Sequence, residues 1–151
     1  MNAVCEALLL LSAASLGIFA GAMLTEGIVL VSFWRSLAPE AFLAWYAAND
    51  RRLLAFFRPL TTATVLLAIA AAVAAWFANS GAFALALVAA LLAVVALATF
   101  FVYFEHANRS FATASIDAGD VAAELARWAA WHWFRTALSV VAFAASLLAL
   151  R

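Results

Sequence analysis

The sequence predicts an all-α integral membrane protein, a four-helix bundle with a short interfacial helix after the first span. The first observation is composition, because 70% of the 151 residues are hydrophobic and only 11% are charged. Soluble domains, by contrast, are about half apolar and about a quarter charged. The second observation is that the apolar residues form four runs, each near the length of about 20 residues that crosses a bilayer. The chain is therefore expected to be a single transmembrane domain over residues 1–151.

The four spans are expected at residues 7–34, 53–77, 83–107 and 127–150. Between the first two, Pro39 stands where a helix commonly begins, and it predicts a short interfacial helix over residues 41–48. Asn49 or Asp50 is then expected to cap the second span. A tight turn with the sequence Asn-Ser-Gly at residues 79–81 is expected to join the second and third spans as an antiparallel hairpin.

The arginines predict how the chain lies in the membrane. Those that flank the two long connections all fall on one side, namely Arg35, Arg51, Arg52, Arg109 and Arg127. The other side has only Arg151. Positive residues favour the cytoplasmic side, so we expect a multi-pass protein of the cell (inner) membrane, with cytoplasmic long loops and both termini outside. The formal net charge is zero and lysine is absent, which excludes a basic surface for nucleic acid.

Ionisable side chains from all four spans are expected to meet at the cytoplasmic level of the bundle. Helical rise places Glu26 and Arg135 each about 12 Å inward from the nearest flanking arginine, and Arg58 about 9 Å inward. A charge at that depth is costly unless it is paired. The expected ion pairs are Glu26 with Arg135 and Glu105 with Arg58, although depth alone leaves the swapped pairing open.

The start of the fourth span carries a stripe of aromatic and ionisable residues. Its members stand at i, i+3, i+4 and i+7, so a helix places them on one face: Trp128, Trp131, His132 and Arg135. The candidate catalytic residues are His132, Arg135, Glu26 and Arg58. The candidate ligand-binding residues are Trp128, Trp131, Asn108, Tyr103 and Glu105. Structural roles are the alternative, because ion pairs can fix helix register, tryptophans form interfacial belts and asparagine caps helix ends.

Three features together resemble a known family. They are the four spans in 151 residues, an asparagine at the end of the third span with a short acidic loop after it (Asn108 to Glu124), and a Trp-x-x-x-His-x-x-Arg motif formed by Trp128, His132 and Arg135. This pattern is similar to the anthrone oxygenase-like family, small four-span membrane proteins long catalogued as a domain of unknown function. The resemblance implies a four-helix membrane bundle and, as for some fungal members, the oxidation of an anthrone to an anthraquinone.

The expected activity is that of an oxygenase-like oxidoreductase acting on a planar aromatic or quinone-type hydrophobic small molecule. His132 would act as general base and Arg135 or Arg58 would stabilise the oxyanion, with no cofactor required. Two cofactor alternatives stay open: a single metal held by His106, His132 and a glutamate, or a haem with both imidazoles as axial ligands. Outside enzymes, the alternative is an accessory subunit of a larger membrane complex, and a homo-oligomer also fits the sequence.

Overall fold

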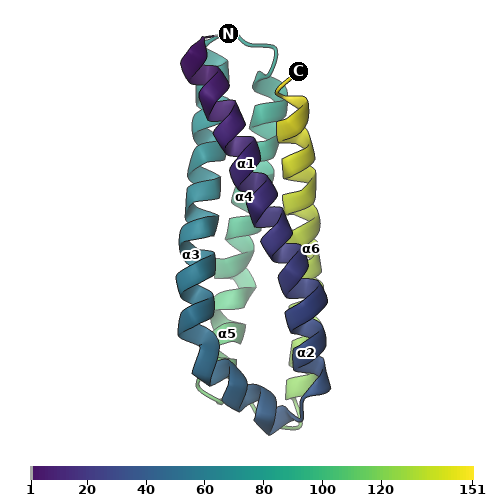
Figure 1. The fold of residues 1–151 in the computed structure, drawn as a ribbon. Coiled ribbons are helices and arrows are strands. Elements are labelled where there is room, and N and C mark those ends of the chain that lie inside the picture. Colours follow the sequence, from purple (N-terminus) through teal and green to yellow (C-terminus); the bar gives the residue numbers. More distant parts are fainter. Residues whose placement is uncertain (1) are drawn as a thin grey trace.

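The computed structural model describes residues 2–151, and this part of the chain is helical apart from short connections, with no strand. Four helical rods lie side by side (Figure 1). The first rod consists of α1 (Ala3–Thr25), the π-helix η1 (Glu26–Leu30) and α2 (Val31–Ser36). The second rod is α3 (Pro39–Phe77), and the fourth is α6 (Val121–Leu148). The third rod consists of α4 (Phe83–Thr99), the π-helix η2 (Phe100–Phe104) and α5 (Glu105–Ala112).

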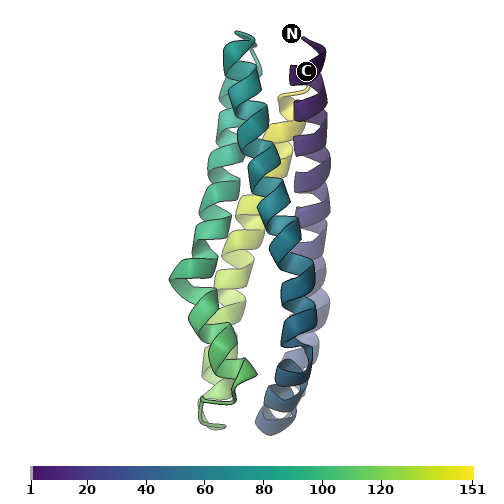
Figure 2. The same cartoon turned by 90° about the vertical axis from the view of Figure 1, so that its left-hand side faces the viewer.

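Each rod packs against two neighbours. Helix α1 contacts α3 and α6, and α4 contacts the same two helices. Consecutive rods run in opposite directions, so the two termini lie together at the upper end of the molecule (Figure 1). The view turned by 90° shows the same arrangement (Figure 2). The lower end therefore holds the link from α2 to α3 and the link from α5 to α6.

The upper half of the molecule has a core made largely of alanine. Its buried residues come from all four rods, and its alanines come from the last three: Ala68, Ala71, Ala72, Ala75, Ala86, Ala89, Ala90, Ala93, Ala142, Ala145 and Ala149. Small side chains let helix backbones approach closely, which is how helices gain van der Waals contact inside a bilayer. Gly17 on α1 extends this surface, since a Cβ atom there would lie 3.0 Å from the ring of Phe143.

The lower half has a core of aromatic rings instead. The indole of Trp34 lies at the centre of this core. Its ring centroid is 5.3 Å from that of Trp128 and 5.6 Å from that of Tyr46. Phe42 and Phe111 continue the cluster toward the lower end, 5.0 Å apart in an edge-to-face arrangement. Aromatic pairs in this geometry are favourable beyond the area that they bury. The buried ionisable groups lie between this aromatic core and the alanine core.

The prediction of a separate interfacial helix after the first span is wrong. Pro39 begins a helix as expected, but that helix continues without a break to Phe77. Asn49 does not cap a new helix, because its side-chain amide donates to the carbonyl oxygen of Trp45 within the same helix (2.8 Å). The first turns of α3 run across the lower end of the molecule before the helix rises (Figure 1). Alanine and leucine residues around Asn49 and Asp50 favour the helical conformation, which helps α3 to continue past these two positions.

Three of the helical rods are long and apolar enough to cross a membrane: Ala3–Ser36, Pro39–Phe77 and Phe83–Ala112. Helix α6, which contains the expected fourth span, is not among them, because His132 and Arg135 lower its mean hydropathy. The outer faces carry exposed large apolar side chains, such as Ile18, Leu66 and Val102. A surface of this kind is unfavourable in water and indicates a membrane protein.

Candidate functional site

The site lies where two rods change from α-helix to π-helix. The segment η1 begins with Glu26, and η2 ends immediately before Glu105. In η1 the backbone N–H of Val31 donates to the carbonyl oxygen of Glu26, five residues earlier. Single π-helical turns are rare and are found frequently at functional sites. No residue pattern in the sequence indicated either one.

A buried ion pair joins the first rod to the fourth. The guanidinium of Arg135 donates from Nη2 to Oε2 of Glu26 at 3.1 Å. Glu26 is only 4% exposed, and its side chain projects from η1 toward α6. The guanidinium carbon of Arg135 also lies 3.9 Å from the ring centroid of Phe104, a cation–π contact. The predicted pairing of Glu26 with Arg135 is thus confirmed.

His132 completes this network and is fully buried. Its Nε2 lies 2.9 Å from the carbonyl oxygen of Met23, which can only accept, so Nε2 carries the proton. Its Nδ1 accepts from Nε–H of Arg135 at 3.3 Å. Nδ1 also lies 3.4 Å from Oε2 of Glu26, but both of these atoms are acceptors and Arg135 bridges them. Both ring nitrogens of His132 are therefore occupied by protein groups, and Trp128 stacks on the ring at 5.1 Å.

Trp128 links the fourth rod to the third. Its indole Nε1–H donates to Oδ1 of Asn108 at 2.8 Å. Trp34 differs in this respect, because its buried Nε1 has no hydrogen-bond partner within residues 2–151. The two tryptophans therefore offer a matched comparison of an indole that is hydrogen-bonded with one that is not.

We expect Trp128→Phe to cost about 1–2 kcal/mol more of the free energy of unfolding than Trp34→Phe. The first change removes a hydrogen bond and leaves Asn108 without its donor, whereas the second removes an unsatisfied donor. Both changes replace a buried indole by a phenyl ring, so the loss of packing is similar. Unfolding by SDS in mixed micelles, followed by far-ultraviolet circular dichroism, measures the difference. Equal losses would contradict the assigned hydrogen bond.

A cavity of about 720 Å³ lies beside this network, and all four rods contribute to its wall. Six of the predicted site residues line it: Glu26, Arg58, Glu105, Asn108, Trp128 and Arg135. Aromatic rings supply much of the remaining wall, with contributions from Phe19, Phe57, Phe100 and Phe101. We call this space the inner cavity. Its size lies within the range of pockets that hold small organic ligands.

The other four predicted site residues do not line the inner cavity. Tyr103 stacks on Trp131 with ring centroids 5.4 Å apart, and its hydroxyl donates to Glu124 at 2.6 Å. His106 is exposed, whereas His132 is buried behind Arg135. Within residues 2–151 no group of three or more His, Cys, Asp or Glu side chains could hold a metal ion. The metal site predicted from His106 and His132 is therefore not formed in this structure.

The predicted ion pair between Glu105 and Arg58 is wrong. Glu105 lies 3.5 Å from Arg109, one helical turn further along α5, and both side chains are largely exposed. Arg58 lies on α3 and forms no ion pair with any carboxylate of residues 2–151. Side chains at i and i+4 on one helix meet without any tertiary contact. The local partner therefore replaces the distant one.

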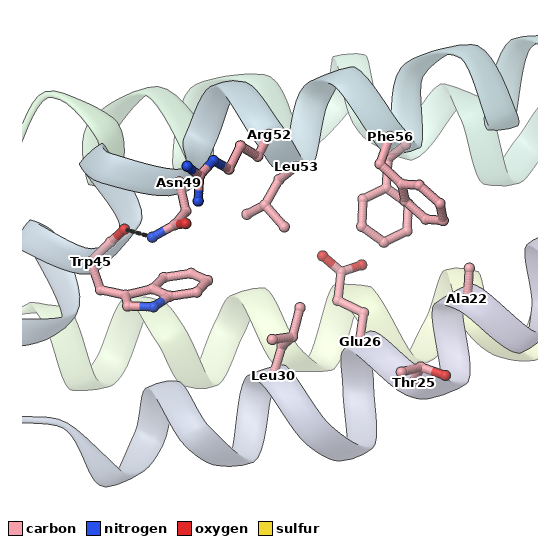
Figure 3. A pocket seen from close by; sticks show the side chains of 10 residues that line it. Ala22, Thr25, Glu26, Leu30, Trp45, Asn49, Arg52, Leu53 and Phe56 are labelled. Atoms are coloured by element: carbon pink, nitrogen blue, oxygen red, sulfur yellow. Dashed lines mark hydrogen bonds between the residues drawn. The ribbon is translucent and has the colours of Figure 1, made fainter.

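A second, smaller cavity of about 420 Å³ lies between the first rod and α3. Figure 3 shows the carboxylate of Glu26 pointing into it, toward Leu53 and Phe56. Three residues line both cavities: Glu26, Leu53 and Phe57. The carboxylate thus belongs to the wall between the two spaces. Its Oε1 accepts no hydrogen bond from residues 2–151, whereas Oε2 is held by Arg135.

Sequence reasoning missed several residues that shape this site. Tyr46 is buried on α3 and lines the inner cavity together with Asp50. Tyr46 falls in the segment that was expected to be interfacial, and Asp50 was expected only as one of two possible caps of the second span, so neither was predicted as a site residue. Gly27 was also missed: a Cβ atom there would lie 3.1 Å from Nε2 of His132 and 3.1 Å from Trp133. A glycine next to the single acid of the first apolar run was the available signal.

We expect Gly27→Ala to destabilise the protein by about 1–3 kcal/mol, because the added methyl group forces His132 and Trp133 to shift in a packed site. Gly21→Ala on the same rod is the control, since nothing lies within 4 Å of a Cβ atom there. Alanine favours helix over glycine by up to about 1 kcal/mol, so the control is expected to be neutral or stabilising. Thermal unfolding in detergent tests both variants. Equal unfolding temperatures of Gly27→Ala and Gly21→Ala would contradict the close approach of η1 and α6.

No family of known proteins, no curated protein and no solved structure matches this chain. The assignment of a function therefore depends on the geometry of the site. That geometry consists of a buried acid and a guanidinium on the wall of a cavity with aromatic sides, and of a buried imidazole that contacts the guanidinium from behind.

Proposed function

We propose that the chain crosses the cell (inner) membrane as a four-helix bundle and oxidises a planar hydrophobic small molecule in the inner cavity. The observation that carries this proposal is the buried Glu26–Arg135 pair on the wall of a cavity of about 720 Å³. A charged pair within a membrane-spanning helix bundle costs free energy of insertion, and such residues usually have a function. The activity is that of an oxygenase-like enzyme, in line with the family that the sequence resembles.

Membrane insertion is supported by the lengths and surfaces of the helices. Three rods can span a bilayer by length and composition. In the fourth, His132 and Arg135 face the interior, where Glu26 and Met23 satisfy them. Polar groups satisfied in this way no longer need water, so α6 is also suited to cross. The arginine-rich lower end is then the cytoplasmic end, with both termini outside.

A planar apolar ligand fits the wall of the inner cavity. Rings from all four rods line it, including Phe19, Phe57, Phe100 and Trp128. Ligand sites of this kind are mainly apolar, and a few polar groups fix orientation. Here Tyr46 and Asn108 are among the polar groups on the wall. A phenol, a quinol or an anthrone-like ketone matches this combination.

Glu26 is the group best placed to remove a proton from such a ligand. Its Oε1 is free of hydrogen bonds from residues 2–151 and borders both cavities. Arg135 neighbours the same space and can stabilise the oxyanion of the resulting phenolate or enolate. His132 holds Arg135 through Nδ1, which makes it a positioning residue in place of the general base expected from the sequence. The electron-rich anion then reacts with oxygen, so that a ring CH₂ and O₂ give C=O and H₂O.

The test uses the purified protein in lipid nanodiscs with anthrone as substrate and an oxygen electrode as detector. We expect one O₂ consumed per anthraquinone formed, at least 10-fold faster than in empty nanodiscs. Leu97→Trp narrows the inner cavity and is expected to lower the rate at least 10-fold. Leu91→Trp on the exposed face of α4 is the control and is expected to have no effect. A rate equal to that of empty nanodiscs, or a Soret band in the active protein, would refute the cofactor-free oxygenase.

The second candidate is a non-enzymatic accessory subunit of a larger membrane complex. The observation in its favour is that Arg135 bonds to Glu26 and His132 bonds to Met23, two contacts between the first rod and α6 that are sufficient to fix their register. Under this alternative, a stoichiometric partner would co-purify and Leu97→Trp would not disturb the complex. Oxygen consumption by the isolated protein would exclude it as the sole function.

A further inference from the structure

We propose that the ligand of the inner cavity is a monoanionic amphiphile, a planar aromatic acid whose carboxylate binds Arg58. The inference rests on the proposed use of the inner cavity as a binding site, and it adds the charge of the ligand and the residue that recognises it. It does not depend on the oxidation step.

The charges that line the inner cavity leave one guanidinium without a partner. Six charged side chains contribute to the wall: Glu26, Asp50, Glu105, Arg58, Arg109 and Arg135. Glu26 is paired with Arg135, and Glu105 is paired with Arg109. Asp50 and Arg58 remain, and neither forms an ion pair with residues 2–151. The cavity therefore offers one acid and one base that are free to bind a ligand.

Arg58 cannot obtain a partner from its own helix. The positions one turn away on either side carry Leu54, Ala55, Thr61 and Thr62, none of which is acidic. Asp50 lies eight residues earlier, about 12 Å along the helix, and side chains at that spacing do not meet. An unpaired guanidinium within an apolar span is costly. An anion brought by a ligand would remove that cost.

The surroundings of Arg58 suit a carboxylate attached to a planar apolar body. Guanidinium groups bind carboxylates through two parallel hydrogen bonds, which are among the strongest in proteins. The cavity that Arg58 lines has a largely apolar and aromatic wall, to which Leu54, Phe57 and Phe101 contribute. The free carboxylate of Asp50 repels an anion at its own level. The two unpaired charges therefore orient the ligand, with its acid group at Arg58.

The binding experiment compares anthraquinone-2-carboxylate with the uncharged anthraquinone-2-carboxamide. Both are titrated into the protein in phosphatidylcholine nanodiscs, and quenching of tryptophan fluorescence reports binding near Trp128, which lines the cavity. We expect the carboxylate to bind about 10-fold more tightly than the carboxamide. Arg58→Gln is expected to weaken binding of the carboxylate about 10-fold and to leave binding of the carboxamide unchanged.

Arg51→Gln is the matched control, because it removes the same charge from the same helix at a residue that lines neither cavity. It is expected to bind both probes as the parent protein does. Equal binding of the carboxylate by the parent protein and Arg58→Gln would overturn the inference, because Arg58 would then not be the residue that recognises the acid group. Displacement of the probe by phosphatidylglycerol would also overturn it, since the site would then belong to a lipid phosphate.

The outcome separates this inference from the proposed oxidation. A protein that prefers the carboxylate through Arg58 but consumes no oxygen with anthrone would refute the enzyme and leave the acid site standing. Oxygen consumption without any preference for the carboxylate would refute the acid site and leave the proposed oxidation standing. Failure of the parent protein to bind either probe would overturn the inference directly.

Discussion

Replacing Arg135 by methionine is expected to lower the free energy of unfolding by about 3–5 kcal/mol, the range for breaking a buried ion pair by removing one partner. Glu26, which is only 4% exposed in the parent protein, would lose its donor. His132 would lose its partner at Nδ1 as well. SDS-induced unfolding in mixed micelles, followed by circular dichroism, measures the loss.

The double variant Glu26→Leu/Arg135→Met is expected to recover most of that loss, because two apolar side chains replace a pair that is costly to desolvate. Arg109→Met is the control for removing a guanidinium. Its partner Glu105 is half-exposed, and pairs of this kind contribute about 0–1 kcal/mol. Losses that simply add in the double variant would show that the two charges do not depend on each other.

Replacing Glu26 by glutamine is expected to lower the rate of anthrone oxidation by about 10²–10⁴-fold, the usual contribution of a positioned general base. The amide oxygen can still accept from Arg135, so we expect the variant to fold, at a lower free energy of unfolding than the parent because the buried guanidinium loses its counter-charge. The rate would fall because an amide cannot take the proton of the substrate. Steady-state oxygen uptake at saturating anthrone measures the change.

Glu6→Gln is the control for this variant, since Glu6 is exposed on the first turn of α1, far along the rod from the site. Its rate is expected to equal that of the parent protein. A folded Glu26→Gln variant that retained more than half of the parent rate would remove Glu26 from the role of base.

Much of the fold could be predicted from composition and helical rise. Long apolar runs predict helices because the bilayer interior leaves backbone groups no other partners. The rise along each helix also predicts how deep a side chain lies in the membrane. Glu26 and Arg135 were expected at equal depth for that reason. The pair forms at 3.1 Å. The aromatic and ionisable stripe on α6 likewise places Trp128, His132 and Arg135 in one network.

The depth of a residue in the membrane, however, does not determine the direction in which its side chain points. Arg58 and Glu105 were paired because their depths were similar, yet Glu105 meets Arg109 on its own helix. His132 was expected to face a substrate, but Met23 and Arg135 occupy its two nitrogens. These contacts depend on the rotation of each helix and on the π-helical turns η1 and η2, and short sequence patterns do not report either.

The continuity of α3 has a related cause. Asn49 and Asp50 have polar side chains that favour caps, and this preference predicted a break. In the structure the helix continues and Asn49 bonds back to Trp45. Local preferences of this size are below about 1 kcal/mol per residue, and tertiary packing overrides them. Buried Phe42 and Tyr46 supply that packing, through contacts with Trp34 and Phe111.

Glu26 and Arg135 meet inside the bundle, and solid-state NMR in lipid bilayers measures this contact most directly. The sample carries ¹³C-labelled glutamate and ¹⁵N-labelled arginine, with Arg109→Gln and Arg127→Gln removing the two other Glu–Arg pairs. We predict strong dephasing of one glutamate carboxyl signal by arginine nitrogen. This dephasing should disappear when Arg135 is also replaced by methionine. Absence of dephasing before that last substitution would contradict the contact.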